Sequence, residues 1–248
     1  LPYQPLPGAA HLEFNGPGHA QVAAIGIGFC LMSRRCLARM TEHYREELWA
    51  DDDIRHSFFI AGPTFTGIID EQGNESWDAG APAARDGFVL PNGNLLIAWS
   101  GEVKELTRDH QVVFHYALSA DNREIGTAQR LDSGHTLIAE LGTKPRLLEV
   151  TAEGKIASET PLTPETDNTH MQTRMARKLG NGNYLVPHLL AFQVKEYSPA
   201  GKVLRSLPTD LPELGGRTAE NWPFTAIRLE NGHTVVNLTH GNKTVELD

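Results

Sequence analysis

The residues best suited to chemistry gather in one stretch, THMQTRMARKLGNGNYLVPHLL, which runs from Thr169 to Leu190. Its His170, Gln172 and Arg174 stand at alternate positions, so in an extended strand their side chains project to one side. Fixed cationic donors of this kind suit an anionic ligand. The stretch is therefore either part of a functional site or one structural repeat that carries polar residues.

Composition limits the partners that such a site can have. The chain has 248 residues, which suffices for one sizeable core, and its formal net charge is -9 at pH 7. Nucleic-acid binding requires clustered lysines and arginines, and the chain has no basic block. We therefore expect no nucleic-acid partner.

The N-terminal part of the chain carries no recognisable signal peptide. The apolar run from Val22 to Met32 has the length of a signal-peptide core, but its positive charges follow it instead of preceding it. No apolar run approaches the roughly 18 residues of a membrane-spanning helix. Cys30 and Cys36 match no common zinc spacing, and we expect two unpaired thiols rather than a disulfide.

Four segments of the chain repeat one pattern: a leucine, a variable residue, Asn or Ser, a glycine, Asn or His, and then an apolar run. These segments are residues 88–99, 129–140, 177–188 and 227–238. Asn-Gly between two apolar segments is a strong hairpin signal, and we expect a type I′ turn with positive φ at both central residues.

A second hairpin follows three of these segments, at residues 104–116, 146–159 and 194–206. Each unit therefore predicts four short antiparallel strands. A four-stranded unit repeated every 40–50 residues or so indicates the blades of an all-β protein, a β-propeller.

The repeat divides the chain into two parts. Residues 56–248 form the predicted propeller domain, with three whole blades between two partial ones, of which the second runs from Pro223 to Asp248. The two partial blades do not complement each other, so we expect a truncated propeller of about five blades or parts of blades. Residues 1–55 predict a coil followed by an amphipathic helix from Cys36 to Ala50.

A small residue stands three positions before the leucine in all four segments. These residues are Gly87, Ala128, Ala176 and Ala226. The innermost strands of a propeller converge on its axis, where large side chains would collide. We therefore assign this position to the innermost strand and attribute its small size to crowding at the axis.

The predicted loops place the candidate site. The turns within the hairpins are tight, whereas the loops at 117–124, 160–169 and 207–221 are long and varied. Because function concentrates on loops that a rigid scaffold carries, we expect the site at the channel mouth on the face with the long loops. Cationic donors and an indole there favour a small anionic or aromatic ligand, or a protein partner. The candidate ligand-binding residues are Gln172, Arg174, His188, Trp222, Arg146 and His240.

Structural roles stay open for several of these side chains. His170 can equally hydrogen-bond a neighbouring blade, and His188 and His240 also suit structural or surface positions. His135 and His233 replace Asn in the tight turns, so we interpret both as structural.

The chain carries no strong catalytic or metal motif. It has no Gly-x-Gly-x-x-Gly, no Gly-Lys-Ser/Thr loop, no Gly-x-Ser-x-Gly and no His-Glu-x-x-His. The acidic run from Asp70 to Asn74 lacks the spaced ligands of a calcium loop and predicts a turn. We expect no metal site.

The pattern Leu-Pro-Asn-Gly-Asn at 90–94, with LLEVTAEGK at 147–155 and VKEYSPAGKVL at 194–204, resembles bacterial secreted propellers of the PQQ-like repeat superfamily. The resemblance covers residues 56–248 and implies a periplasmic or secreted propeller. Quinoprotein dehydrogenases of similar architecture carry a recurring Ala-x-Asp-x-x-Thr-Gly-x-x-x-Trp motif. No blade of this chain has that motif, so we expect neither PQQ nor another cofactor.

The segment around His170 is also similar to bacterial arylsulfotransferases, propellers in which a histidine takes the sulfuryl group. Their His-x-Asn motif is matched by His-Met-Gln at 170–172, and their Ser-x-Arg-His by only Val-Pro-His at 186–188. The resemblance implies that His170 is the candidate catalytic nucleophile and that Arg174 and His188 bind the sulfate. Two functions therefore stay open: a binding propeller without catalysis, and an arylsulfotransferase-like enzyme.

Overall fold

The computed structural model describes residues 57–61, 65–70, 74–241 and 243–248 of the chain. The predicted N-terminal part, residues 1–55 with its helix from Cys36 to Ala50, lies outside the described residues. Asn242 and residues 71–73 of the predicted acidic turn lie outside them as well.

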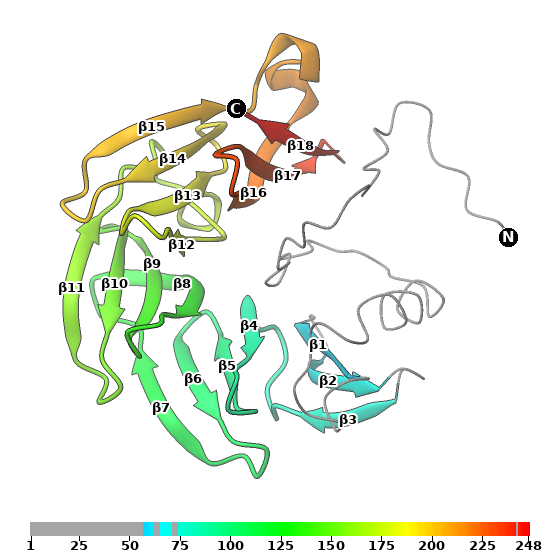
Figure 1. Cartoon of the computed structure of the whole chain (residues 1–248), viewed down its shortest axis with the longest axis vertical. Coiled ribbons are helices and arrows are strands. Elements are labelled where there is room, and N and C mark those ends of the chain that lie inside the picture. The colour runs from blue at the N-terminus through cyan, green and yellow to red at the C-terminus, as the bar shows by residue number, and fades with distance from the viewer. Residues whose placement is uncertain (1–56, 62–64, 71–73, 242) are drawn as a thin grey trace, which may run out of the picture.

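The described residues form five antiparallel sheets around a common centre (Figure 1). Three sheets have four strands each. The first consists of β4 (Asp86–Val89), β5 (Leu95–Ala98), β6 (Glu102–Leu106) and β7 (Val112–Ala117), and the second of β8 (Asn122–Arg130), β9 (Thr136–Gly142), β10 (Arg146–Val150) and β11 (Ile156–Pro161). The third consists of β12 (Arg177–Lys178), β13 (Tyr184–His188), β14 (Gln193–Tyr197) and β15 (Val203–Pro208). The two three-stranded sheets are β1 (Ser57–Ala61), β2 (Thr66–Asp70) and β3 (Glu75–Asp78), and β16 (Asn221–Arg228), β17 (Thr234–His240) and β18 (Lys243–Leu247). The prediction of an all-β propeller with three whole and two partial blades is confirmed.

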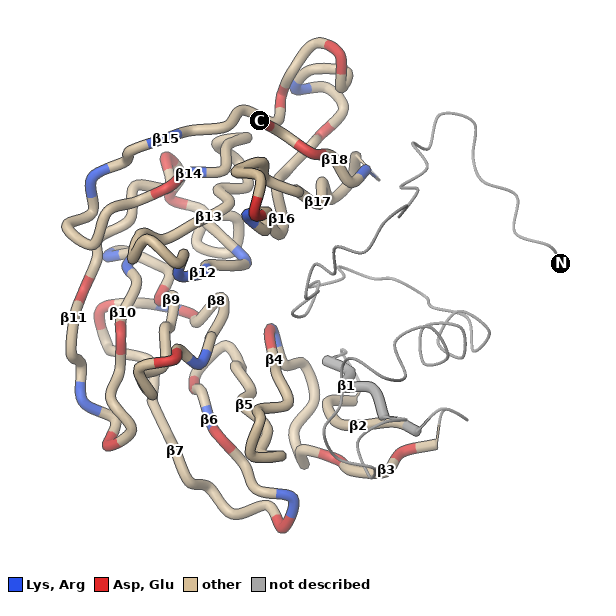
Figure 2. Tube along the Cα trace, viewed as in Figure 1, with Lys and Arg blue, Asp and Glu red and all other residues tan. Residues whose placement is uncertain are grey.

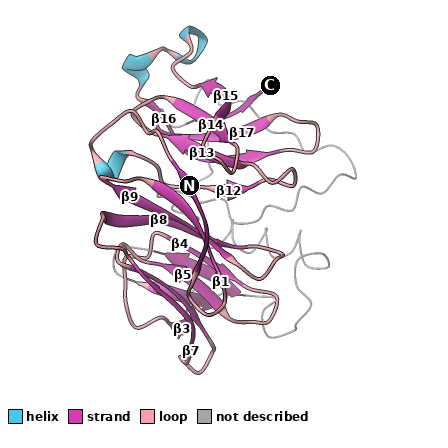
Figure 3. Cartoon of the chain, turned by 90° about the vertical axis from the view of Figure 1, so that its left-hand side faces the viewer, coloured by secondary structure: helices cyan, strands magenta, loops and turns pink. Residues whose placement is uncertain are grey.

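The blades present two different faces. In the whole blades the first strand lies nearest the centre and the fourth lies at the rim (Figure 1). The connections between blades at residues 162–176 and 209–220 are long and carry the short 3₁₀ helices η1 (Thr169–Met171), η2 (Pro212–Leu214) and η3 (Arg217–Ala219). The connection at residues 118–121 is short, because β8 begins at Asn122, so the long loop predicted at 117–124 was wrong. Figure 3 shows these helices on one side of the sheets, which we call the long-loop face.

The tight turns differ in type from the prediction. The N–H of Gly93 donates to the carbonyl of Leu90 at 2.9 Å, and the N–H of Leu90 donates to the carbonyl of Asn94 at 2.8 Å. Gly93 has a φ of +80°, whereas Asn92 is not among the residues with positive φ. The loop is therefore a three-residue turn that ends in a left-handed glycine, and the type I′ prediction was wrong. The Asn92 Oδ1 accepts the N–H of Asn94 at 3.0 Å, which explains the preference for Asn or Ser at this position.

Apolar clusters join each sheet to the next one. Ala128 packs with Leu96 and Phe114 of the preceding blade, and Ala176 and Ala226 lie in the equivalent clusters of the next two blades. All three alanines are at most 2% exposed. Ala128 and Ala226 lie in the innermost strands as predicted, and Ala176 immediately precedes β12, but their small size reflects close packing between sheets rather than crowding at the axis.

A glutamate with a largely buried side chain in the third strand of each whole blade ties that blade to the next. Glu105 accepts hydrogen bonds from Asn92 and Asn94, in the tight turn of its own blade. It also accepts one at 2.6 Å from Nη2 of Arg130, in the inner strand of the following blade. The next two blades repeat this arrangement, with Lys178 at 2.5 Å from Glu149 and Arg228 at 3.0 Å from Glu196.

The histidines in the tight turns take part in the same contacts. His135 Nδ1 lies 3.7 Å from Glu149, and His233 Nδ1 lies 2.7 Å from Glu246. Both histidines therefore have the structural role that their position in the repeat predicts.

We expect Glu105→Ala to lower the free energy of unfolding by about 2–4 kcal/mol, because the change leaves the Arg130 guanidinium without its carboxylate. Urea unfolding followed by circular dichroism measures this loss. Glu213→Ala, an exposed glutamate in η2, is the control and should cost less than about 0.5 kcal/mol. Equal, small losses in both variants would show that the glutamate does not hold the blades together.

Candidate functional site

The segment that carries His170 is not an extended strand. Residues Thr169–Met171 form η1, and the inner strand β12 begins only at Arg177. A 3₁₀ turn has three residues per turn, so successive side chains point about 120° apart instead of alternating. The predicted alternation was therefore wrong: His170 is exposed, whereas Gln172 is buried.

Gln172 clamps two blades together through its side-chain amide. Its Oε1 accepts the N–H of Gly142 at 2.9 Å, and its Nε2 donates to the carbonyls of Gly142 and Thr166 at 3.0 and 3.2 Å. The side chain is 2% exposed. Its two amide donors and its oxygen are thus engaged with the backbone.

Arg174 meets residues from two other blades near the centre of the propeller. Arg85 immediately precedes β4, and Glu124 lies in β8. The Glu124 Oε2 accepts a hydrogen bond from Arg85 Nη2 at 2.8 Å and lies 3.4 Å from His170 Nδ1. The Glu124 Oε1 lies 3.3 Å from Arg174 Nη1. We call Arg85, Glu124, His170 and Arg174 the channel-mouth cluster, after the place where we expect a ligand.

Arg174 is a buried cation whose hydrogen bonds are incomplete. Its side chain is 8% exposed, and its Nη2 has no hydrogen-bond partner among the described residues. Burial, followed by the positive charge of Arg85, lowers the pKa of Arg174 to about 10, against the opposing effect of Glu124. Because two guanidinium groups share one carboxylate, the cluster carries a net positive charge.

A second polar layer lies one to three residues further along the same strands. Arg177 donates from Nη1 to Thr127 Oγ1 at 2.8 Å and from Nη2 to Asp86 Oδ2 at 3.2 Å. The Thr127 hydroxyl also donates to Asp86, and the Arg177 guanidinium lies 5.0 Å from the ring centre of Phe88. Figure 2 shows the charged positions of β4 and β12 on the strands that border the centre. Both terminal nitrogens of Arg177 are paired, so this layer contrasts with Arg174.

His188 is fully buried in β13. Its Nε2 lies 2.9 Å from the hydroxyl of Tyr197, and its Nδ1 has no partner among the described residues. Burial, and then the charge of Lys195, lowers the pKa of His188 to about 3, so the ring is neutral at physiological pH. His188 thus presents neither an exposed nitrogen nor a positive charge, and no described contact joins it to His170 or Arg174.

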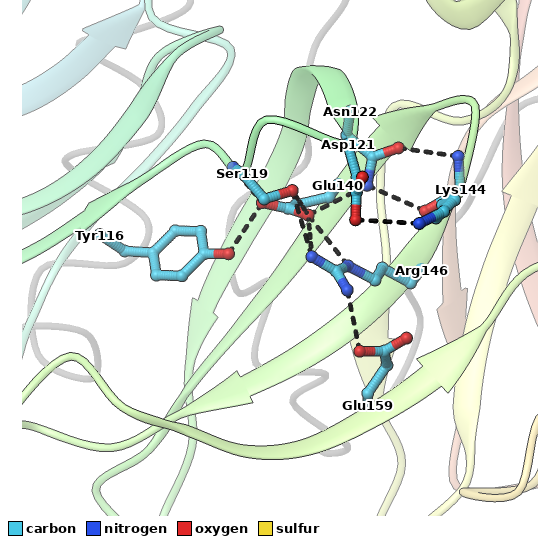
Figure 4. Close-up of polar contacts among 8 residues, drawn as sticks. All are labelled: Tyr116, Ser119, Asp121, Asn122, Glu140, Lys144, Arg146 and Glu159. Carbon is cyan, nitrogen blue, oxygen red and sulfur yellow. Dashed lines mark hydrogen bonds and ion pairs between the residues drawn. The ribbon is translucent and has the colours of Figure 1, made fainter.

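Arg146 belongs to a separate buried cluster around Glu140 (Figure 4). The carboxylate of Glu140, which is 0% exposed, accepts two hydrogen bonds from Arg146 and others from Tyr116, Ser119 and Asn122. Burial would raise the pKa of Glu140, but the hydrogen bonds from Asn122, Ser119 and Tyr116 lower it to about 2. Arg146 is therefore a partner in a satisfied network that holds a loop between blades.

Trp222 and His240 lie together on the last blade. Their ring centres are 4.4 Å apart, and His240 Nδ1 lies 2.9 Å from Glu220 Oε2. Asn221, the residue before Trp222, pairs with His240 across β16 and β17. The structure thus brings these two predicted residues together, in a partly exposed stack with no described contact to the channel-mouth cluster.

A groove of about 520 Å³ also opens on the long-loop face, between the second and third whole blades. Its lining is mostly polar and includes the buried Gln172 and the charged side chains of Arg123, Glu165 and Asp167. Glu165 is paired with the buried Lys195 at 2.8 Å. The groove therefore lacks the net positive charge of the channel-mouth cluster.

Sequence reasoning missed Arg85 and Glu124. Arg85 stands two residues before Gly87, as Arg174 stands two residues before Ala176, so the repeat itself contained a signal for Arg85. Glu124 gave no such signal, because the pairing of β8 with β9 shifts register twice between Asn122 and Thr127.

The fold agrees with that of known proteins. No protein-family model matches the chain, and no curated protein matches it. Among solved structures, a protein of unknown function from Bacteroides caccae is 26% identical, with a TM-score of 0.66 over 78% of this chain and 68% of that chain. A streptogramin B lyase is 14% identical, with a TM-score of 0.54 over 78% of this chain and 68% of the lyase. The WD40 β-propeller domain of Doa1 is 15% identical, with a TM-score of 0.54 over 74% of this chain and 56% of that chain. These similarities, together with the sheets, show that the chain is a β-propeller protein.

Two further findings concern the described residues alone. They contain no group of three or more His, Cys, Asp or Glu side chains placed to hold a metal ion. Within the same residues, no helix is long and apolar enough to cross a membrane.

The low pKa of Glu140 predicts a pH-dependent stability. A carboxylate whose pKa falls from 4.5 to about 2 on folding stabilises the protein above pH 4.5, by on the order of 3 kcal/mol, and this contribution is lost as the pH falls through 2. We therefore expect Glu140→Gln to lower stability at pH 7 and to flatten the pH dependence between 4.5 and 2, measured by urea unfolding.

Glu159 provides the matched control for this measurement. It also pairs with Arg146, at 2.9 Å, but is 50% exposed. Glu159→Gln should cost less than about 1 kcal/mol and leave the pH dependence unchanged. An unchanged pH profile in Glu140→Gln would contradict the account.

Proposed function

We propose that this propeller binds a small anionic ligand at the channel mouth on the long-loop face, with Arg174 as the principal cationic donor. The single observation that carries the proposal is the buried Nη2 of Arg174, which has no partner among the described residues. A buried charged donor without an acceptor is costly, and natural proteins rarely keep one without a ligand or another use.

Charge supports the same proposal. The chain carries a formal net charge of -9, yet Arg85 and Arg174 at the channel mouth face one carboxylate. A local positive site within low-dielectric walls concentrates small anions. A protein partner presents the same carboxylate chemistry through its acidic side chains or its carboxyl terminus.

The resemblance to secreted PQQ-like repeat propellers supports a location outside the cytoplasm. Fractionation of cells that express the natural gene tests this part. Recovery of the protein in the periplasm or the medium supports it, and recovery only with the cytoplasmic fraction contradicts it.

Binding can be measured by isothermal titration calorimetry with sulfate, benzoate and 4-nitrophenyl sulfate at constant sodium chloride. We expect at least one of them to bind, and Arg174→Gln to weaken binding about tenfold or more, because it removes the charge and the bidentate donor edge. Arg205→Gln, in the outer strand β15, is the matched control and should bind as the wild type does.

The stability of Arg174→Gln gives a second prediction. Because Arg174 is a buried cation with an unpaired nitrogen, Arg174→Gln should keep or raise the free energy of unfolding, by up to about 1 kcal/mol. Loss of binding together with a large loss of stability would mean that Arg174 is structural, and equal binding in wild type and Arg174→Gln would refute the proposed site.

A second candidate function is sulfuryl transfer through His170. The observation that favours it is the placement of an exposed imidazole with Nδ1 3.4 Å from Glu124 and with Arg174 on the same carboxylate. Nε2 would attack sulfur as the bond between sulfur and the phenolic oxygen breaks, and phenolate would leave. A second phenol would then take the sulfuryl group from Nε2 and lose its proton to solvent.

Transfer from 4-nitrophenyl sulfate to phenol, followed by release of 4-nitrophenol, tests this candidate. Activity in the wild type that falls by about a hundredfold or more in His170→Ala would support it. His135→Ala, a turn histidine remote from the channel, controls for general effects of histidine removal. No transfer by a protein that binds 4-nitrophenyl sulfate would leave binding as the function.

A further inference from the structure

We infer that Glu124 is an internal competitor for the anion site, and that the external ligand is an oxoanion that must displace it from Arg174. The inference rests on the proposed function and deepens it, because it names the class of the ligand and the residue that limits its affinity.

The contacts of Glu124 are unequal. Its hydrogen bond to Arg85 Nη2, at 2.8 Å, has the length of a charge-assisted hydrogen bond. Its contacts with Arg174 Nη1, at 3.3 Å, and with His170 Nδ1, at 3.4 Å, are long. Glu124 is therefore anchored by Arg85 and only loosely held by Arg174.

The free edge of Arg174 defines the class of the ligand. Nη1 is weakly bonded, and the adjacent Nη2 has no partner among the described residues. A guanidinium presents such neighbouring N–H groups to two oxygens of one planar or tetrahedral anion. Carboxylates, sulfate and phosphate esters supply these two oxygens, whereas chloride supplies a single centre.

A glycine in β8 allows the segments that carry Glu124 and Arg174 to lie close together. Gly126, two residues after Glu124, lies where β8 changes register against β9. A Cβ there would lie 3.2 Å from the carbonyl oxygen of Thr173, the residue before Arg174. The glycine therefore permits the close approach of the two inner segments that carry Glu124 and Arg174.

Competition predicts opposite effects for the two partners of Arg174. Glu124→Gln removes the internal negative charge and keeps an amide oxygen for Arg85, so both guanidinium groups become available to an external anion. Arg85→Gln removes the anchor, so Glu124 has Arg174 as its remaining guanidinium and competes more strongly for it.

The test is a sulfate titration of the full chain by calorimetry at constant ionic strength, set with sodium fluoride so that no other oxoanion is present, and repeated with chloride in place of sulfate. We expect Glu124→Gln to bind sulfate about tenfold more tightly than the wild type, and Arg85→Gln to bind it about tenfold more weakly. The double variant Glu124→Gln, Arg85→Gln should bind more tightly than Arg85→Gln alone, because the competitor is absent. Chloride should give no saturable binding to any of these proteins.

The outcomes separate this inference from the proposed function. Suppose that Arg174→Gln abolishes sulfate binding, and that folded Glu124→Gln binds sulfate more weakly than the wild type does. This result would overturn the role of Glu124 as a competitor but would leave the anion site at Arg174 intact. Failure of sulfate to bind both the wild type and Glu124→Gln would overturn the site itself. Saturable chloride binding that competes with sulfate would overturn the oxoanion class.

Folding is checked by circular dichroism and thermal unfolding. Glu124→Asp gives a second, charge-preserving comparison in case the amide variant misfolds. Glu124→Asp retains the competing charge, so it should bind sulfate more weakly than Glu124→Gln. If Glu124→Gln misfolds and the double variant folds, Glu124→Asp should bind sulfate more weakly than the double variant. Equal or tighter binding in Glu124→Asp would contradict competition by charge.

Discussion

The structure depends on a repeated ion pair between blades, in which a largely buried glutamate side chain of one third strand contacts a cation on the next inner strand. Glu105 and Arg130 form one such pair, and Glu149 with Lys178 and Glu196 with Arg228 form the next two. Glu105 and Glu196 also accept hydrogen bonds from the tight turns of their own blades, and Glu149 lies 3.7 Å from His135 of its turn, so each glutamate contacts a hairpin and the neighbouring inner strand at once. Breaking a buried pair by removing one partner leaves an uncompensated charge, so the angle between blades has little freedom. This constraint brings Arg85, Glu124 and Arg174, which belong to three blades, to one place.

Against this background the unpaired nitrogen of Arg174 is informative. Glu140 is surrounded by donors, and Arg177 pairs with both Asp86 and Thr127. Arg130 and Arg228 each leave a buried Nε unpaired, but both of their terminal nitrogens are bonded. Arg174, by contrast, leaves a terminal nitrogen without a partner among the described residues, and this difference is why we propose it as the donor to an external anion.

Much of the fold could be predicted from the sequence, because a blade is a local unit whose turns and strands repeat. The repeated Leu-x-Asn/Ser-Gly pattern located the hairpin between the first two strands in four blades, and the second hairpins and the partial blades followed from the segments beside it. Details that depend on tertiary context could not be predicted. The hairpin turn has one left-handed residue instead of two, and η1 replaces an extended strand where the chain crosses between blades. Among the candidate site residues, Arg174 and His170 share a carboxylate, whereas His188 is buried beside Tyr197 and Arg146 is bonded to Glu140. Glu124 lies beyond a register shift that no periodic pattern reveals.

The central claim is that an oxoanion binds against Arg174 inside the channel mouth. The most direct measurement is a crystal structure after a soak in selenate, with anomalous diffraction collected at the selenium edge. The claim predicts an anomalous peak whose oxygens lie within hydrogen-bonding distance of Arg174 Nη1 and Nη2, with Glu124 retained on Arg85. A channel mouth without a peak, with selenate bound only to exposed lysines elsewhere, would contradict it.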